Sequence, residues 1–267
     1  MSTFFTVALL ALFSLAAHGK FAANANMESA TTNFTTQGRV LLLTRSDGTG
    51  PSVFQMRGFS YSSYRIGEGP NGATDGPNGY DSVSRPTICD QDFGLMRKVN
   101  VNAIKIYDFN TVGTDIDAQH KECLDRAWNN GSQPIFIILS VYITTLPFGS
   151  AAQRSSMAAR YTSMVSSTAD HPAVLGYSIG SEIGGDPNNN APYWSDFNVI
   201  AQAARTALKG RRKIITTGTY QADCTSCSPV VPCIGHIING EKFHAPVDVW
   251  GVDVYSPNPQ DPELLRN

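Results

Sequence analysis

The chain has 267 residues, of which 42% are hydrophobic and 16% charged, and its formal net charge is -2. This balance is typical of a globular protein and excludes a disordered tail. No basic stripe is present, so the composition argues against nucleic acid as a partner, and the low charged fraction favours uncharged polar partners such as sugars. The length fits one barrel of the (β/α) type, for which about 250 residues is typical, or two small domains.

The amino terminus has the pattern of a secretory signal peptide. Residues 4–17 form an uncharged apolar run, and the small residues Ala17 and Gly19 offer a cleavage site. We therefore expect residues 1–19 to be a signal peptide and the protein to be secreted. The run is shorter than the ~20 apolar residues that span a bilayer, with a signal anchor as the alternative. No later stretch is apolar enough for a membrane helix, so we expect no transmembrane segment in the mature protein.

Sequons and cysteines fit the same route. Asn33 and Asn130 each begin a glycosylation triplet. Five cysteines in an exported protein point to disulfides rather than to a reactive thiol, and the odd count leaves one without a partner. A zinc site at Cys224, Cys227 and Cys233 is the alternative, because a CxxC pair is a common half-site. No histidine stands at ligand spacing beside them, so we favour a loop disulfide there and expect no metal.

The remaining chain alternates between predicted strands and helices. Residues 20–38 are rich in Ala, Asn, Thr and Ser and are expected to form a flexible entry segment, which leaves 39–267 for the barrel domain. Strand-like runs at 40–44 and 53–61 precede a surface loop in which Gly-Pro-Asn-Gly occurs twice. The predicted helices that follow are 90–99, 119–128, 151–167 and 193–208, and the predicted strands are 103–107, 134–141, 173–179, 213–217 and 247–254.

This order is the signature of α/β architecture with a parallel sheet. Counting from 54–61 gives six strands, which are six of the eight βα units of a TIM (β/α)8 barrel. We therefore expect an incomplete TIM-type barrel, truncated at its carboxyl end.

Side chains that suit a carbohydrate cleft stand where the predicted strands end, and parallel barrels carry their active sites at those ends. Aromatic rings can stack on sugar faces, while carboxylates and hydroxyls can hydrogen-bond sugar hydroxyl groups. The strand-end residues are Tyr61, Ser62, Tyr107, Asp108, Ser140, Tyr142, Ser181, Glu182, 217–220 and 253–255. Among them we expect substrate contacts from Tyr61, Tyr107, Asp108, Ser181, Asp253 and Tyr255.

Glu182 stands apart from these residues. It follows the predicted buried strand 173–179 in the Gly-rich sequence GSEIGG. Burial raises the pKa of a carboxyl group and keeps it protonated near neutral pH, as a general acid requires when it protonates a glycosidic oxygen. A solvated loop glutamate is the alternative. His171 lies at the opposite end of the same strand and is expected to be structural.

Several segments carry a more specific pattern. HPAVLGYSIGSE at 171–182 resembles the fourth-strand motif of retaining glycoside hydrolases, which ends in Gly-Asn-Glu with the Glu as acid/base. RGFSY at 57–61 resembles their first strand, and VWGVDVY at 249–255 their sixth. CDQD at 89–92, VNAIKIY at 101–107 and HKEC at 120–123 are similar to family 72, the fungal-type β-1,3-glucanosyltransferases.

The resemblance spans roughly residues 52–257 and implies three things about this chain. Glu182 is implied to be the general acid/base, and the substrate to be a β-glucan. Cys89 and Cys123 match the two cysteines that are bridged in family 72, and such a link stabilises a fold by about 3 to 4 kcal/mol in the loop-entropy model.

Three positions depart from the family pattern. Ser181 replaces an Asn that hydrogen-bonds the sugar 2-hydroxyl, and Lys105 replaces an Arg and so loses its planar fork. The family nucleophile is a Glu at the end of the seventh strand, about 5 to 5.5 Å from the acid/base. Neither Glu241 nor Glu263 follows such a strand, so we assign no nucleophile. The chain is thus expected to be a fragment of a longer enzyme or a catalytically impaired relative.

Together these features predict a secreted glycosidase or transglycosidase that acts on β-glucan of the cell wall by a retaining mechanism. It is expected to be an extracellular or wall-bound monomer with a polysaccharide substrate and without a cofactor or nucleic-acid partner. The alternative from another class is a catalytically inactive carbohydrate-binding or wall-structural protein on the same scaffold. A hydrolase of another barrel family, of the mannanase or glucosidase type, is a third reading.

Overall fold

The computed structural model describes residues 32–45, 48–63, 81–110, 115–180, 183, 191–219 and 234–252. Several predicted features lie outside these residues. They are the signal peptide 1–19, Ser181, Glu182, Asp253, Tyr255, Glu263, and the cysteines Cys224, Cys227 and Cys233.

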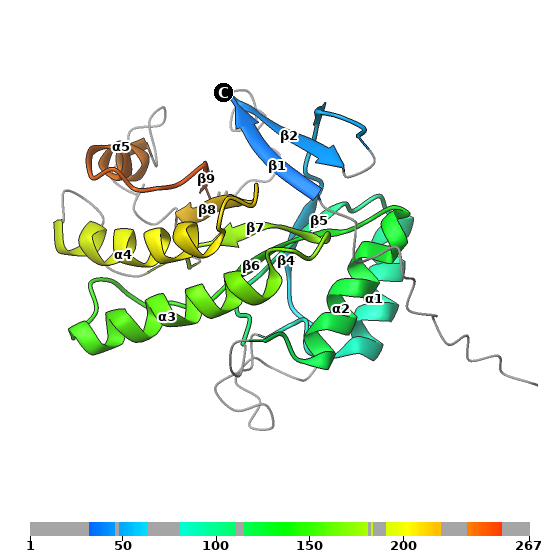
Figure 1. Ribbon diagram of the computed structural model, residues 1–267, viewed down its shortest axis with the longest axis horizontal. Coiled ribbons are helices and arrows are strands. Elements are labelled where there is room, and N and C mark those ends of the chain that lie inside the picture. Colours follow the sequence, from blue (N-terminus) through cyan, green and yellow to red (C-terminus); the bar gives the residue numbers. More distant parts are fainter. Residues whose placement is uncertain are drawn as a thin grey trace, which may run out of the picture.

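A parallel sheet forms the centre of the fold (Figure 1). Its strands are β4 (Gly58–Tyr61), β5 (Ala103–Ile106), β6 (Phe136–Ser140), β7 (Val174–Ser178), β8 (Ile214–Thr219) and β9 (Val249–Val252). They lie side by side in the order of the chain, and every neighbouring pair is parallel. Each strand is therefore laid next to the one before it by a crossover, as in a TIM barrel. The predicted α/β barrel with six strands is confirmed as a curled half-barrel.

Helices cover the outside of this sheet. They are α1 (Pro86–Lys98), α2 (Ala118–Trp128) with the 3-10 turn η2 (Asn129–Gly131), α3 (Ala151–Thr168), α4 (Ala191–Ala207) and α5 (Ile234–Lys242). Figure 1 shows α1 beside α2 on one flank and α3 beside α4 on the other. Local signals start them: Pro86 opens α1, and Asp117 and Ser150 cap α2 and α3 with side-chain oxygens that accept backbone N–H groups.

The core lies between sheet and helices. All residues of β6 and β7 are buried, as expected for parallel strands that are covered on both faces. β7 and β8 approach so closely at Gly176 that a Cβ there would lie 2.3 Å from the carbonyl oxygen of Ile214. Only glycine allows this spacing, so Gly176 sets how tightly the sheet curls at its middle.

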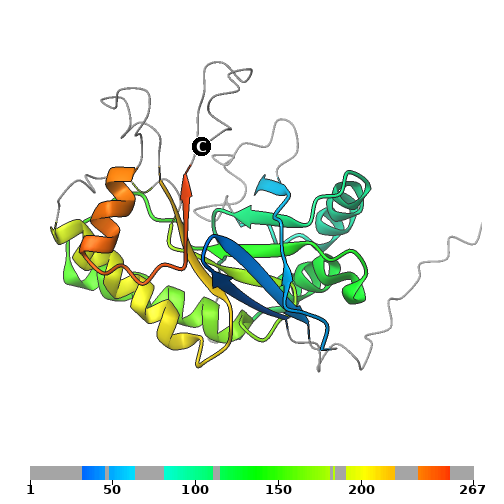
Figure 2. The same ribbon diagram turned by 90° about the horizontal axis from the view of Figure 1, so that it is seen from above.

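A small antiparallel sheet of β1 (Thr32–Gln37), β2 (Val40–Arg45) and β3 (Ser52–Val53) crosses the amino-terminal end of the large one (Figure 2). Thr32 Oγ1 donates to the carbonyl oxygen of Pro172 at 2.6 Å, and the Phe34 amide donates to that of Arg212 at 2.7 Å. The Phe34 ring packs edge to face on Phe136, with centroids 5.0 Å apart. These contacts close the end of the half-barrel opposite the predicted active site.

The prediction of a flexible entry segment at 20–38 is wrong for residues 32–37, which form β1. Their polar composition hid the strand, because only Thr32 and Phe34 point inward, and both are 2% exposed. The stabilising partners of β1 are far along the chain, beyond the reach of a local pattern.

Candidate active site

The carboxyl ends of the parallel strands meet at one edge of the sheet. Register places Tyr61 of β4 opposite Ile106 of β5, and Ser178 of β7 between Ser140 of β6 and Thr216 of β8. The structure thus brings together the described ends of neighbouring strands from β4 to β8. Ser181 and Glu182 follow β7 in the sequence, and Asp253 and Tyr255 follow β9, but all four lie outside the described residues. Their roles stay predictions.

Tyr61 lies at the end of β4 and is only 4% exposed. Its hydroxyl donates to Asp92 Oδ2 on α1 at 2.8 Å. Burial, together with this bond to a carboxylate, raises the pKa of Tyr61 well above its ordinary value. The contact ties the first strand to the first helix, and the proposed contact of Tyr61 with substrate stays a prediction.

Asp108 follows β5 and links three elements at the edge where the carboxyl ends of the parallel strands meet, which we call the mouth of the half-barrel. Its Oδ1 accepts the Tyr142 amide at 2.9 Å and Arg160 Nη2 at 3.2 Å, from the segment after β6 and from α3. Burial raises the pKa of Asp108, and the amide bond and the Arg160 charge offset part of that shift. Asp108 therefore holds the ends of β5 and β6 in register, while Tyr107 beside it is partly exposed and Tyr142 is exposed.

Tyr161, on the buried face of α3, fixes the backbone that leads to Glu182. Its hydroxyl donates to the Ser178 carbonyl oxygen at 2.8 Å and accepts the amides of Gly180 at 2.8 Å and Val141 at 3.3 Å. The side chain is fully buried, and burial raises the pKa of Tyr161 to about 12. The phenol thus stays neutral and replaces water for three backbone groups.

The turn at Gly180 is fixed from the other side as well. Ser178 Oγ donates to the Gly180 carbonyl oxygen at 2.7 Å, and Thr217 Oγ1 donates to that of Ile179 at 2.9 Å. Gly180 has φ of +61°, and a Cβ there would lie 2.5 Å from Ile183 Cγ1. A left-handed glycine inside a net of buried hydrogen bonds therefore lies directly before Ser181 and Glu182 in the chain.

Sequence reasoning missed Tyr161 because a tyrosine on an amphipathic helix looks like any core aromatic residue. The available signal is weak: Ser140, Ser178 and Gly180 carry polar side-chain or backbone groups at buried strand ends, and these groups need hydrogen-bond partners.

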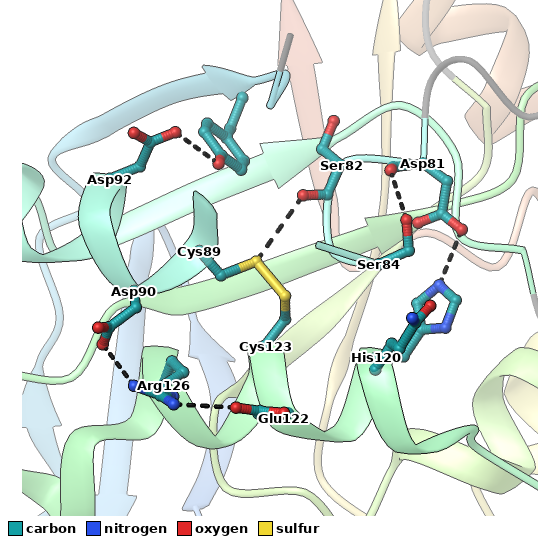
Figure 3. The surroundings of a disulfide bond; sticks show 12 residues. Asp81, Ser82, Ser84, Cys89, Asp90, Asp92, His120, Glu122, Cys123 and Arg126 are labelled. Atoms are coloured by element: carbon teal, nitrogen blue, oxygen red, sulfur yellow. Dashed lines mark hydrogen bonds and ion pairs between the residues drawn. A yellow bond between two sulfur atoms is a disulfide. The ribbon is translucent and has the colours of Figure 1, made fainter. Parts of the chain in front are cut away.

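The predicted bridge between Cys89 and Cys123 is confirmed (Figure 3). It joins α1 to α2 with a Cα–Cα distance of 5.6 Å, and both residues are fully buried. Arg126 of α2 reinforces the helix pair by an ion pair with Asp90 of α1 at 2.7 Å. Two helices that flank the mouth are thereby joined covalently.

The other predicted positions lie away from the mouth. Asn33 lies on β1 and is half-buried, whereas Asn130 is exposed in η2 with φ of 53°. His171 donates Nε2–H to Asp125 Oδ1 at 3.0 Å and accepts the Ala173 amide at Nδ1, at the amino end of β7.

In the residues that the structure describes, no group of three or more His, Cys, Asp or Glu side chains could hold a metal ion. No helix of that part is long and apolar enough to cross a membrane.

Solved structures with the same fold include β-glucuronidases from Parabacteroides merdae and Ruminococcus gnavus. Each has a TM-score of 0.53, with 12% and 15% sequence identity. The matched region is 85% of this chain in both cases, and it is 22% and 32% of the two β-glucuronidase chains, respectively. At this identity the likeness shows the fold, that of TIM-barrel glycoside hydrolases.

Curated proteins give closer matches in sequence. A 1,3-beta-glucanosyltransferase from Arthroderma benhamiae is 24% identical over 218 residues, 79% of this chain and 36% of that protein. The pH-responsive protein 1 of Candida albicans is 22% identical over 172 residues, 64% of this chain and 29% of that protein. The chain therefore spans about a third of the length of these relatives.

The sequence profile of the glucanosyltransferase family, glycoside hydrolase family 72, matches residues 24–256. This range contains all the described strands and helices, the joined helices α1 and α2, and the turn at Gly180. The chain belongs to the glucanosyltransferase family of glycoside hydrolase family 72.

Proposed function

We propose that the protein is a secreted enzyme that remodels β-glucan of the cell wall by a retaining mechanism, with Glu182 as general acid/base. Membership of the glucanosyltransferase family gives the class of reaction. The observation that carries the assignment of the residue is the turn at Gly180, where Tyr161, Ser178 and Thr217 fix the backbone immediately before Ser181 and Glu182. A catalytic group must be held to within about 0.5 Å, and such a backbone is suited to that task.

The chemistry assigned to Glu182 has two halves. As an acid it gives its proton to the glycosidic oxygen while the C1–O bond breaks. A second carboxylate attacks C1 in the same step and forms the covalent glycosyl-enzyme intermediate. As a base it then removes the proton from the hydroxyl that attacks this intermediate. An acceptor sugar in that step gives transfer, and water gives hydrolysis. We assign the nucleophilic carboxylate to no residue of this chain.

Residues beside Glu182 are proposed to bind the sugar. Ser181 offers one hydroxyl where the family has an amide, so we expect a weaker hold on the sugar 2-hydroxyl. Tyr107 and Tyr255 are proposed to stack on sugar faces, and Asp108 and Asp253 to hydrogen-bond hydroxyl groups. Asp108 already has Tyr142 and Arg160 on one oxygen, which fixes the direction of the carboxylate.

Secretion, glycosylation at Asn33 and Asn130, action as a monomer, and location outside the cell or in its wall belong to the same proposal. The uncharged apolar run at 4–17 and the buried disulfide both favour the secretory route.

The test replaces Glu182→Gln in the full chain and measures conversion of laminari-oligosaccharides together with their binding by calorimetry. We expect conversion to fall by roughly 10²- to 10⁴-fold, the usual share of a general acid/base, with binding within about threefold. Glu241→Gln, at an exposed carboxylate on α5, is the matched control and should convert like the wild type. Equal conversion by both variants would exclude Glu182 as the acid/base. Binding without conversion by the wild type would favour a carbohydrate-binding protein instead.

A further inference from the structure

A histidine at the start of α2, His120, lies between the carboxylates of Asp81 and Asp117. Figure 3 shows its contact with Asp81. His120 Nε2 is 2.8 Å from Asp81 Oδ2, and His120 Nδ1 is 2.5 Å from Asp117 Oδ2. The imidazole is 5% exposed and the Asp81 side chain 7% exposed, so water has little access to the first of these pairs. The other Asp81 oxygen, Oδ1, is buried and has no hydrogen-bond partner among the described residues.

The proton count of this cluster determines the state of the ring. A neutral imidazole carries one N–H and one lone pair, so it can satisfy only one of two carboxylates. With Asp81 and Asp117 both ionised, the two contacts are favourable together only when His120 is an imidazolium that donates from each nitrogen. Burial works against that charge, but the hydrogen bonds and charges of Asp81 and Asp117 outweigh it, so the pKa of His120 is raised.

Aromatic and charged groups from neighbouring elements surround this cluster. The Phe109 ring, at the end of β5, has its centroid 4.5 Å from that of His120. Beyond Asp81 stands Asp108, which a backbone bridge places beside it and which is paired with Arg160 of α3. On α2 itself, Lys121 turns away to Asp125.

His171 shows what a neutral buried histidine looks like in this fold. It donates to the single carboxylate of Asp125 and accepts a backbone amide at its other nitrogen, which satisfies both nitrogens without a positive charge. Burial lowers the pKa of His171 in spite of the nearby Asp125. The difference between the two histidines is thus the second carboxylate.

Asp81 transmits the state of His120 to the mouth. Its backbone forms the bridge with Asp108, and its Oδ2 also lies 3.4 Å from the Asn110 amide. Asp108 in turn holds the Tyr142 amide after β6. A chain of direct contacts therefore runs from α2 through Asp81 to the carboxyl ends of β5 and β6.

We propose that protonated His120 is a positioning residue of the active site: it holds Asp81 against α2 and so keeps the Asp108 wall of the sugar cleft in place. Loss of the proton removes one of the two hydrogen bonds, so sugar binding weakens as the pH rises. The part about sugar binding rests on the proposed function, whereas the protonation and its effect on stability do not.

The first test is an NMR titration of the histidine side chains in the full chain, with His120→Gln and His171→Gln used to assign the signals. We expect His120 to titrate above 6.5 and His171 below it, from the two opposite shifts. A titration of His120 at or below 6.5 overturns the proposal.

The second test follows the Tm of each variant between pH 5 and 9. A raised folded-state pKa gives stability that is fully present below 6.5 and is lost as the pH rises through the folded value. His120→Gln should therefore lower the Tm most at pH 5, by roughly 3–10 °C, and progressively less at alkaline pH. His171→Gln should show the opposite trend.

Asp117→Asn is a second variant, which serves if His120→Gln folds poorly. It keeps a good helix cap but removes one carboxylate, so it should lower the pKa of His120. Parallel Tm profiles for all variants contradict the proposal.

The third test measures laminari-oligosaccharide binding in a Glu182→Gln background, which prevents turnover. Affinity should fall between pH 5.5 and 8 when His120 is present and stay flat in His120→Gln, which should bind roughly 3- to 10-fold more weakly at pH 5.5. The same pH dependence with and without His120 overturns its role at the mouth. If no variant binds at any pH, the proposed function and the positioning role both fall, while the titration still decides the protonation state.

Discussion

The disulfide between Cys89 and Cys123 offers the sharpest prediction on stability. The two residues are 34 positions apart, and opening that loop restores conformational entropy to the unfolded chain. The loop-entropy relation gives about 3.8 kcal/mol for this separation at 25 °C. Both side chains are fully buried, so replacing each sulfur by hydrogen leaves a small void that adds on the order of 0.5 kcal/mol. The double variant Cys89→Ala, Cys123→Ala should therefore lose about 4 to 5 kcal/mol.

Urea unfolding of the purified protein measures this loss as the difference between the free energies of unfolding extrapolated to water, with the slope fitted separately for each variant because the unbridged unfolded chain is more expanded. At about 2–4 °C per kcal/mol, the Tm should fall by roughly 8–20 °C. Each single variant should lose nearly as much as the double, because either change breaks the same bond and the effects cannot add. A loss under about 1.5 kcal/mol in the double variant, or single losses that sum to the double, would show that the bridge does not stabilise the fold by restricting the unfolded chain.

Three further substitutions probe the backbone around the mouth and the far end of the half-barrel. Tyr161→Phe leaves the Gly180 amide without its partner and should cost about 1–3 kcal/mol in urea unfolding, and an unchanged midpoint would contradict the role of the phenol. Gly180→Ala should lose at least about 1 kcal/mol, because it has positive φ and its Cβ would meet Ile183, and conversion of laminari-oligosaccharides should fall more than binding does. Burial lowers the pKa of Lys213 to about 7, while in the unfolded chain the lysine keeps its proton up to about pH 10.5. The free energy of unfolding of the wild type should therefore rise with pH between 7 and 10.5, and that of Lys213→Met should not. Parallel curves for the two proteins would show that the lysine stays charged in the fold.

Local patterns were sufficient for much of the fold. Buried runs such as the strand β6 and the amphipathic pattern of the helix α2 depend on neighbours within a few residues, so spacing and residue type reveal them. The order of strands follows from crossovers that place each new strand beside the last. The bridge between Cys89 and Cys123 came from the family resemblance rather than from spacing.

Long-range partners limited the rest. β1 depends on Pro172, 140 residues away, and its polar sequence gave no sign of that contact. His120 matched a family pattern, but the sequence does not show that it lies between Asp81 and Asp117. Asp81 is held there by its backbone bridge with Asp108, which is 27 residues further along the chain. Tyr161 acts on backbone groups of β6 and β7, which carry no signal in a sequence. Such groups become functional only when packing brings them together.

The most direct test of the account is a crystal structure of the Glu182→Gln protein with a laminari-oligosaccharide. We predict a sugar chain across the carboxyl ends of β4 to β9, in contact with Tyr107, and a glycosidic oxygen within about 2.6–3.2 Å of the side chain at position 182. A sugar chain bound elsewhere, such as in the groove lined by Asn198, Gln202 and Thr206 on α4, with the mouth empty, would contradict it.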